Sequence, residues 1–432
     1  MTTAISPNYQ ESQLFVSAIE ELEACEIVIV LAALVLALIG ISIQLAKLHQ
    51  VAKSAPRLQI LGKCLALEPL SSDQDAQARG AKVAVIIPAY NEADNIEGCV
   101  TSVLESTEAA TESITVWVVD DQSSDRTLEI AQTLQTTLND PRFNILVGQP
   151  RPQDEGWIGK NWACFQGAQQ ARGEFLLFLD ADVRLKPGAI ATAIYTMQTE
   201  AIDLLTLCPQ VVCGCLGEWL VQPLILALLA VGFDFSEVSD PTSEVAFANG
   251  QFMLFRRSAY ETLGGHRAVA RQVVEDVELA RRVKQKGLAL KYAIGHDLAS
   301  VRMYPSWAAV WEGWTKNWYL GSRRNLPVTL YTAGIVVWLC ALPWLVLVFL
   351  LGQAIFMGLN WLGWLAVGVA FATIVLQYEL RQTIKEITAI PPRYWWLTSL
   401  GGILVAAIAL GSIIKTETGW GWTWRGRSLK GK

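Results

Sequence analysis

The chain has 432 residues, of which 52% are hydrophobic and only 17% are charged, so membrane segments combined with a globular part are expected. Its formal net charge of -6 argues against nucleic acid as the main partner. The eight cysteines form no CxxC pair and the three histidines are scattered, which argues against a zinc or histidine metal site and favours reduced thiols in a cytoplasmic compartment.

The N-terminal region has the pattern of a membrane anchor. Residues 1–26 form an acidic tail without Lys or Arg, and residues 27–45 are almost uninterrupted apolar residues that match the thickness of a bilayer core. Lys47, Lys53 and Arg57 follow, so the positive-inside rule places the N-terminus outside and the next domain in the cytoplasm. A cleavable signal peptide is less favoured because no basic region precedes the apolar stretch. Residues 46–81 are predicted to be a linker.

From residue 82 the pattern is that of an α/β domain. Strands are expected at 83–87, 114–119, 143–147 and 175–179, and helices at 96–104, 127–138 and 162–171. This alternation predicts a doubly wound, mostly parallel sheet with a ligand cleft at the carboxyl ends of its strands. No GxGxxG follows the first strand and no GxxxxGK[ST] occurs, which weakens dinucleotide-binding and P-loop interpretations.

The fourth predicted strand ends in Asp180-Ala181-Asp182. Alternate residues of a strand point the same way, so the two carboxylates can share one hard cation, Mg²⁺ or Mn²⁺, with substrate phosphates. Taken alone, the pattern is equally consistent with two solvated loop acids.

The next region contains several apolar and aromatic stretches. Residues 216–233 carry Glu218, Gln222 and Pro223, so they are predicted to form a helix at the membrane interface, with an ordinary buried helix as the alternative. Residues 247–260 are strand-like, and residues 264–265 form a turn. A helix is expected at 274–286, where a helix cap is the simplest role of Glu275 or Asp276 taken alone.

The C-terminal third is predicted to be membrane-embedded. Tryptophans and basic residues between 307 and 324 have the pattern of an interfacial belt that also lines a site. Apolar segments at about 332–351, 354–376 and 396–414 have spanning length. One anchor plus three spans would place the C-terminus outside, whereas the basic tail at 424–430 favours the cytoplasm. Either one segment is re-entrant or the tail departs from the rule.

Five motifs follow one another along the chain: VIIPAYNE (85–92), VVDDQSSD (118–125), GWIGKNWA (156–163), FLDADV (178–183) and VVEDVELA (273–280). Over about residues 83–320 this order resembles the family 2 glycosyltransferases, which have the GT-A fold. The chain is most similar to membrane-bound members that glycosylate isoprenoid lipids, the hopene-associated and the carotenoid (myxol 2'-O-) glycosyltransferases.

The resemblance implies a role for each matching position. The positions that match donor-nucleotide contacts are Pro88, Tyr90, Glu92, Asp120, Asp121, Lys160 and Asp180. Asp180 and Asp182 match the pair that binds the divalent metal and the diphosphate, and Asp276 matches the general base. Residues 82–215 would then be the nucleotide-sugar-binding half, residues 216–325 the acceptor half, and residues 326–432 the membrane segments and basic tail.

These roles are chemically consistent with inverting sugar transfer. A metal on the two aspartates neutralises the leaving diphosphate, and Asp276 accepts the proton of the attacking hydroxyl. The acceptor is expected to be a membrane lipid with a hydroxyl at headgroup level: a carotenoid, hopanoid, polyprenyl phosphate or diacylglycerol. The sugar and the nucleotide (UDP, GDP or TDP) stay open.

Two alternatives remain, a polysaccharide or glycolipid synthase and a non-catalytic sugar-nucleotide-binding membrane protein. Many membrane members of the family carry Q-x-x-R-W, but residues 314–318 read WTKNW and keep only the final Trp318. This departure weakens the synthase interpretation, and the intact acids weaken the non-catalytic one.

Overall fold

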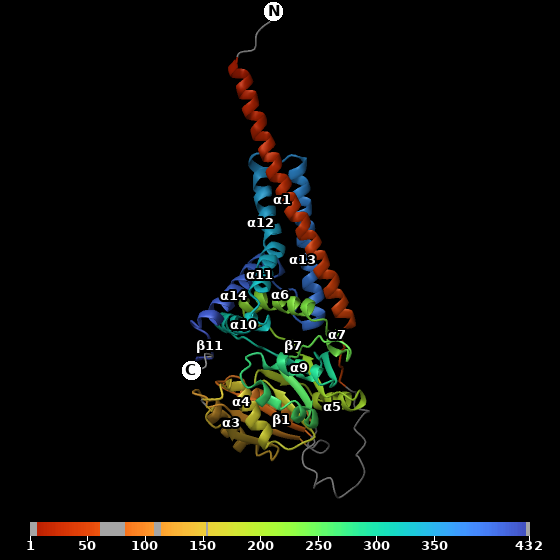
Figure 1. Ribbon diagram of the computed structural model, residues 1–432, viewed down its shortest axis with the longest axis vertical. Helices are drawn as coiled ribbons and strands as arrows, with labels where there is room; N and C mark the ends of the chain where they lie inside the picture. The colour runs from red at the N-terminus through yellow and green to blue at the C-terminus, as the bar shows by residue number, and fades with distance from the viewer. Residues whose placement is uncertain (1–6, 61–82, 108–113, 153, 429–432) are drawn as a thin grey trace, which may run out of the picture.

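The computed structural model describes residues 7–60, 83–107, 114–152 and 154–428. It consists of a bundle of long helices standing on an α/β domain (Figure 1). Residues 1–6 of the acidic tail, most of the predicted linker (61–81) and residues 429–432 of the basic tail lie outside the described residues.

The α/β domain is built on a seven-stranded sheet of order β3-β2-β1-β4-β8-β6-β9. The strands are β1 (Val83–Ala89), β2 (Ile114–Asp120), β3 (Phe143–Val147), β4 (Phe175–Leu179), β6 (Leu204–Cys208), β8 (Phe252–Arg256) and β9 (Leu290–Ile294). Only β8 runs antiparallel to its neighbours, β4 and β6. The predicted α/β, mostly parallel sheet is therefore confirmed. Strand β4 is its central strand, and all five of its apolar side chains are buried.

Helices cover both faces of the sheet. Alternate residues of β1 enter different cores, Val83 and Val85 on one face and Ala84 and Ile86 on the other. The helices of the domain are α2 (Ile96–Glu105), α3 (Thr127–Leu138), α4 (Gly159–Gln170), α5 (Ala189–Thr199), α7 (Phe235–Ser239), α8 (Arg257–Thr262) and α9 (Glu275–Gln285). A smaller sheet contains β5 (Val183–Leu185), β10 (Ala299–Val301) and β7 (Gln210–Val211).

Two predicted boundaries in this domain are wrong. The strand expected at 247–260 is confined to β8, because a turn in which the Phe252 amide donates to the Asn249 carbonyl (3.2 Å) precedes it and helix α8 follows it. Helix α4 begins at Gly159 rather than at residue 162. The earlier start places Lys160 in the first turn of this helix.

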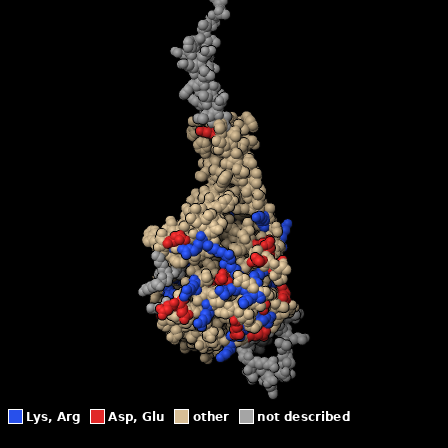
Figure 2. Space-filling view, in the orientation of Figure 1, with Lys and Arg blue, Asp and Glu red and all other residues tan. Residues whose placement is uncertain are grey.

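Four helices among the described residues are long and apolar enough to cross a membrane: Cys25–Ser54, Leu326–Phe356, Trp361–Thr388 and Trp395–Thr418. The first is the apolar part of α1 (Pro7–Ser54), and the second comprises α11 (Leu326–Cys340) and α12 (Leu342–Phe356). The break expected at 352–353 lies instead between α12 and α13 (Trp361–Thr388). Large apolar side chains such as Phe349 and Ile355 are exposed on the bundle, and its upper part carries almost no charge (Figure 2).

The arrangement of these helices bears on the predicted topology conflict. Helices α1, α12 and α13 stand upright, whereas α14 (Thr398–Thr418) slants across the base of the bundle and ends beside the α/β domain (Figure 1). The final hairpin, β11 (Thr423–Trp424) and β12 (Arg427–Ser428), contacts the α/β domain through an Arg425–Glu92 ion pair. The basic tail therefore lies on the same side as that domain, as the re-entrant alternative requires.

Two helices lie between the bundle and the sheet, α6 (Leu216–Gly232) and α10 (Trp307–Gly321) (Figure 1). Most of α6 is buried within the protein, including Glu218, which accepts hydrogen bonds from the amides of Gly214 (2.7 Å) and Cys215 (3.0 Å). Helix α6 thus packs as a buried helix, and its position at a membrane interface stays a prediction.

Candidate active site

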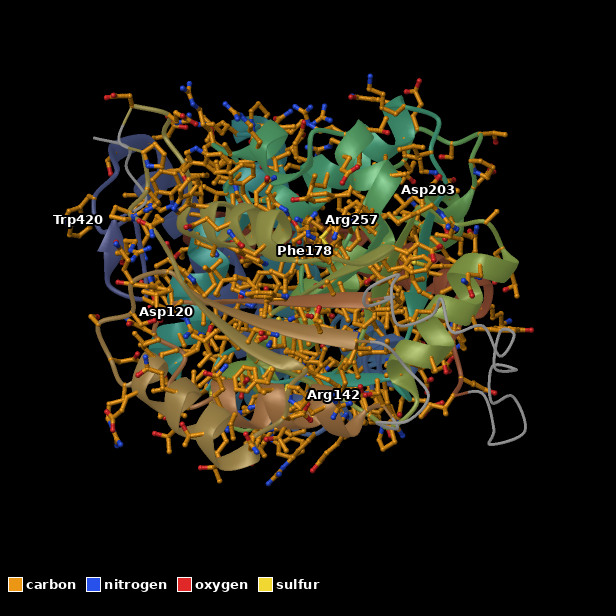
Figure 3. All side chains as sticks on the ribbon, turned by 90° about the horizontal axis from the view of Figure 1, so that it is seen from below. Asp120, Arg142, Phe178, Asp203, Arg257 and Trp420 are labelled. Carbon is orange, nitrogen blue, oxygen red and sulfur yellow. The ribbon has the colours of Figure 1, made fainter. Side chains whose placement is uncertain are left out.

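The candidate site lies at the carboxyl ends of the parallel strands. Figure 3 shows Asp120 at one end of the sheet, the end near Trp420, and Asp203 toward the opposite end. The Asp121 amide donates to the Ala89 carbonyl (2.8 Å), which joins the loops after β1 and β2. The Glu92 amide donates to Thr127 Oγ1 (2.7 Å) and ties the same loops to the start of α3. These bonds bring the first two sequence motifs together.

Lys160 is the centre of the site. Its Nζ lies 2.8 Å from Asp180 Oδ1 and 2.8 Å from Glu275 Oε1. Burial opposes the charge on Lys160, but the two carboxylates prevail and raise its pKa well above the ordinary value. Burial likewise opposes ionisation of Glu275, yet Lys160 holds the pKa of Glu275 below its usual range. Glu275 is therefore an ion-pair partner rather than a helix cap, and it was not among the predicted site residues.

Asp276 is held beside this ion-pair network. Its Oδ2 accepts a hydrogen bond from the Gly250 amide (2.8 Å), and its Oδ1 accepts one from the Val277 amide (2.8 Å). Burial and the neighbouring Glu275 raise the pKa of Asp276 to about 6. A Cβ on Gly250 would lie 3.0 Å from both Asp276 Oδ2 and Lys160 Nζ. Because Gly250 has no side chain, Asp276 Oδ2 and Lys160 Nζ can both lie close to its backbone.

The Asp180–Asp182 pair has features that fit a divalent cation. Asp182 Oδ1 is buried and has no hydrogen-bond partner among the described residues. Burial, followed by the charges of Asp180 and Glu92, raises the pKa of Asp182 well above its ordinary value. A cation between the two carboxylates would give Asp182 Oδ1 a partner and would stabilise the charged form of Asp182. Within the described ranges no cluster of three or more acidic, His or Cys side chains is placed to hold a metal, so further ligands would come from the donor and water.

The remaining predicted donor residues meet the C-terminal hairpin. Arg427 forms an ion pair with the carboxylate of Asp121 and lies 3.6 Å from the centre of the Tyr90 ring. Arg425 Nη2 lies 2.8 Å from Glu92 Oε1. Burial raises the pKa of both acids, although the arginines oppose it. Asp120 is also buried and accepts from the Ser123 amide (3.2 Å), whereas Pro88 lies inside strand β1.

Sequence reasoning missed Glu275, Gly250 and the two arginines. The signal for the arginines was present in the basic tail, which was interpreted only as a topology marker. Helix α10 contacts the hairpin, because Lys316 Nζ lies 4.0 Å from the centre of the Trp424 ring, and its predicted role as a wall of the site stays a prediction. Burial lowers the pKa of Lys316 to about 8, although nearby acids oppose it.

Comparison with protein-family models gives two matches. The model described as glycosyl transferase family 2 matches residues 84–264, and that of glycosyl transferase family group 2 matches residues 175–410. Together these ranges include every acid of the candidate site.

Among curated proteins the chain is similar to 4,4'-diaponeurosporenoate glycosyltransferases. It is 29% identical to that of Staphylococcus haemolyticus (strain JCSC1435) over 249 residues, 57% of this chain and 63% of that protein. It is 29% identical to that of Staphylococcus aureus (strain USA300) over 263 residues, 60% of this chain and 65% of that protein. The chain thus spans less than two thirds of the length of these relatives.

Solved structures also align with the chain, at low sequence identity. A mannosyltransferase from Pyrobaculum calidifontis, in complex with GDP-Man and Mn²⁺, is 16% identical with a TM-score of 0.49, covering 90% of this chain and 99% of that one. TarS 1–349 of S. aureus, in complex with UDP, is 15% identical with a TM-score of 0.36, covering 80% and 93%.

Proposed function

The chain belongs to the family 2 glycosyltransferases, and we propose that it is an inverting enzyme that moves a sugar from a nucleotide-diphosphate sugar to a hydroxyl of a membrane isoprenoid lipid. A carotenoid is the favoured acceptor, since the curated relatives described above are named 4,4'-diaponeurosporenoate glycosyltransferases, after a carotenoid. Myxol-type 2'-O-glycosylation and transfer to a hopanoid are specific reactions of this class.

The observation that carries the proposal is the joining of three motifs around Lys160. This residue, from the start of α4, pairs with Asp180 at the end of β4 and with Glu275 at the start of α9. The next residue, Asp276, has a pKa raised toward neutrality. A non-catalytic binding domain has no evident need for such a base beside a cation and two further acids.

The chemistry follows from these positions. The acceptor oxygen attacks the anomeric carbon while the bond from that carbon to the diphosphate oxygen breaks, and the electron pair leaves with the diphosphate. Asp276 takes the hydroxyl proton, which its raised pKa favours over an ordinary aspartate. Asp180 and Asp182 would hold a divalent metal that neutralises the leaving diphosphate. Lys160 supplies a fixed positive charge at the same end of the site.

The structure also supports a membrane acceptor. The hairpin that contacts Glu92 and Asp121 also contacts Glu312 of α10, below a helical bundle. The upper surface of this bundle is apolar (Figure 2). A small apolar cavity of about 30 Å³ lies at the base of the bundle, lined by residues that include Ile41, Leu224, Val336 and Leu380. With the basic residues after the anchor on the inner side, the catalytic domain faces the cytoplasm.

The test is transfer of labelled sugar in carotenoid-containing membranes. Membranes with the wild-type chain or Asp276→Asn are incubated with radiolabelled UDP-, GDP- and TDP-sugars and Mn²⁺ or Mg²⁺. The proposal predicts label in an organic-extractable pigment with the wild-type chain alone. Label in insoluble polymer would support the polysaccharide-synthase alternative, and a complete lack of transfer would support the non-catalytic one.

A further inference from the structure

The C-terminal hairpin of residues 423–428 reaches the predicted donor residues from the far end of the chain. Arg427 donates to the Asp121 carboxylate and, through Nη2, to the Asp121 carbonyl (2.8 Å). Its guanidinium lies 3.6 Å from the centre of the Tyr90 ring. Both partners of Arg427 are thus positions assigned to the nucleotide of the donor.

The rest of the hairpin is anchored separately. Thr423 Oγ1 donates to Glu312 Oε1 (2.8 Å), and the Arg425 amide donates to Glu312 Oε2 (3.3 Å). The Arg425 side chain pairs with Glu92 (2.8 Å) and donates to the Asn91 carbonyl. Because these contacts involve neither Asp121 nor the face of Tyr90, the hairpin can stay attached while the Arg427 side chain moves.

The charges of the site are compatible with such a movement. The Asp121 side chain is only 4% exposed, so it cannot lose Arg427 without gaining another donor. The N–H and O–H groups of a nucleoside supply donors to Asp121, and its planar base can stack on Tyr90 where the planar guanidinium now lies. An incoming diphosphate, in turn, needs cations in addition to Lys160, whose charge is shared with two carboxylates.

We propose that Arg427 is a donor-binding residue that changes partners. In the donor-free protein it occupies Asp121 and Tyr90, and when a nucleoside diphosphate binds, the nucleoside takes these positions while the guanidinium transfers to the phosphates. The Asp121 carboxylate and the Arg427 guanidinium each have a partner before and after the exchange. The inference rests on the proposed function, since it assumes that Tyr90 and Asp121 contact a nucleotide.

The test compares ligands with and without phosphates. Binding of UDP, GDP and TDP with Mn²⁺, and of uridine, guanosine and thymidine, is measured by calorimetry on the purified full chain and on Arg427→Ala. We expect Arg427→Ala to weaken binding of the favoured diphosphate about tenfold, the scale of a lost charge-assisted hydrogen bond. Binding of its nucleoside should be unchanged or tighter, because Tyr90 and Asp121 become free.

Two further variants keep the test decisive. Arg427→Gln keeps hydrogen-bonding ability without the charge and should also lose diphosphate binding. Arg324→Ala removes an exposed ion pair between Arg324 and Glu417 (3.2 Å), which lies ten residues before Arg427 in the sequence. This control variant should bind the diphosphate and the nucleoside as the wild-type chain does. Melting temperatures identify any variant that fails to fold.

Each other result overturns the inference. Unchanged diphosphate binding in both Arg427 variants would mean that Arg427 has only a structural role. Tighter diphosphate binding would mean that Arg427 only blocks the nucleotide position and does not bind the phosphates. If the wild-type chain bound none of the diphosphates, the proposed function would fail as well. If the wild-type chain bound one and the variants bound it equally, the failure would be confined to Arg427.

Discussion

Replacement of Lys160 by Met tests the network at the centre of the site. Lys160 Nζ lies 2.8 Å from both Asp180 Oδ1 and Glu275 Oε1, and the Glu275 side chain is only 7% exposed. Breaking a fully buried ion pair costs about 3–5 kcal/mol. Since the Lys160 side chain is 32% exposed, solvent screening reduces the expected loss to about 2 kcal/mol.

The loss should depend on pH in a defined direction. Lys160 lowers the pKa of Glu275, so this stabilisation is present above the unfolded pKa of the carboxyl and disappears as pH falls through the folded one. Thermal unfolding in detergent should show a fall in Tm of several degrees at pH 7.5 and a smaller fall near pH 3, below the ordinary pKa of the carboxyl. The control is Lys291→Met, which removes a more exposed pair with Glu200 (2.5 Å) and should cost under about 1 kcal/mol. This account of the network would be refuted if Lys160→Met lowered Tm no more than the control does, or if it lowered Tm equally at both pH values.

Three other predictions concern the base and the metal pair. Gly250→Ala places a Cβ 3.0 Å from Asp276 Oδ2 and Lys160 Nζ. The added methyl group should displace the base by a few tenths of an ångström, so kcat should fall about tenfold with little change in Tm. Unchanged steady-state kinetics would contradict this prediction. Because Asp276 has a pKa of about 6, kcat should fall about tenfold for each pH unit below that value, and a profile flat down to pH 5 would exclude Asp276 as the titrating base. Asp182→Asn removes a buried carboxyl whose pKa is well raised, so the metal-free variant should melt at or above the wild-type temperature while Mn²⁺ no longer stabilises it; full stabilisation by Mn²⁺ would remove Asp182 from the metal site.

Local patterns were sufficient to predict much of the α/β domain. The predicted ranges of α3, β3 and β4 match the structure, because an uninterrupted apolar run or a helical period identifies such elements without information from elsewhere in the chain. The acids that follow β2 and β4 were predicted at the site because parallel strands bring their carboxyl ends to one edge. Lys160 was assigned from the family resemblance.

What the sequence did not predict depends on contacts between distant segments. Arg427 reaches Asp121 across 306 positions, and a basic tail alone does not specify which acid it meets. The antiparallel β8 looks like any other apolar strand, since its direction is set by its pairing with β4 and β6. The slanting course of α14 depends on its packing against α10 and α11, whereas its length and composition are those of a spanning helix.

The central claim is that Asp276 is the base of a sugar transfer. It is tested most directly by measuring transfer and donor binding together in Asp276→Asn. This variant keeps the size of the side chain and, with its single amide oxygen, one of the two hydrogen bonds from the Gly250 and Val277 amides. The account predicts that labelled sugar no longer reaches a membrane lipid while the nucleotide sugar binds with nearly wild-type affinity. Full turnover in this variant would contradict the account.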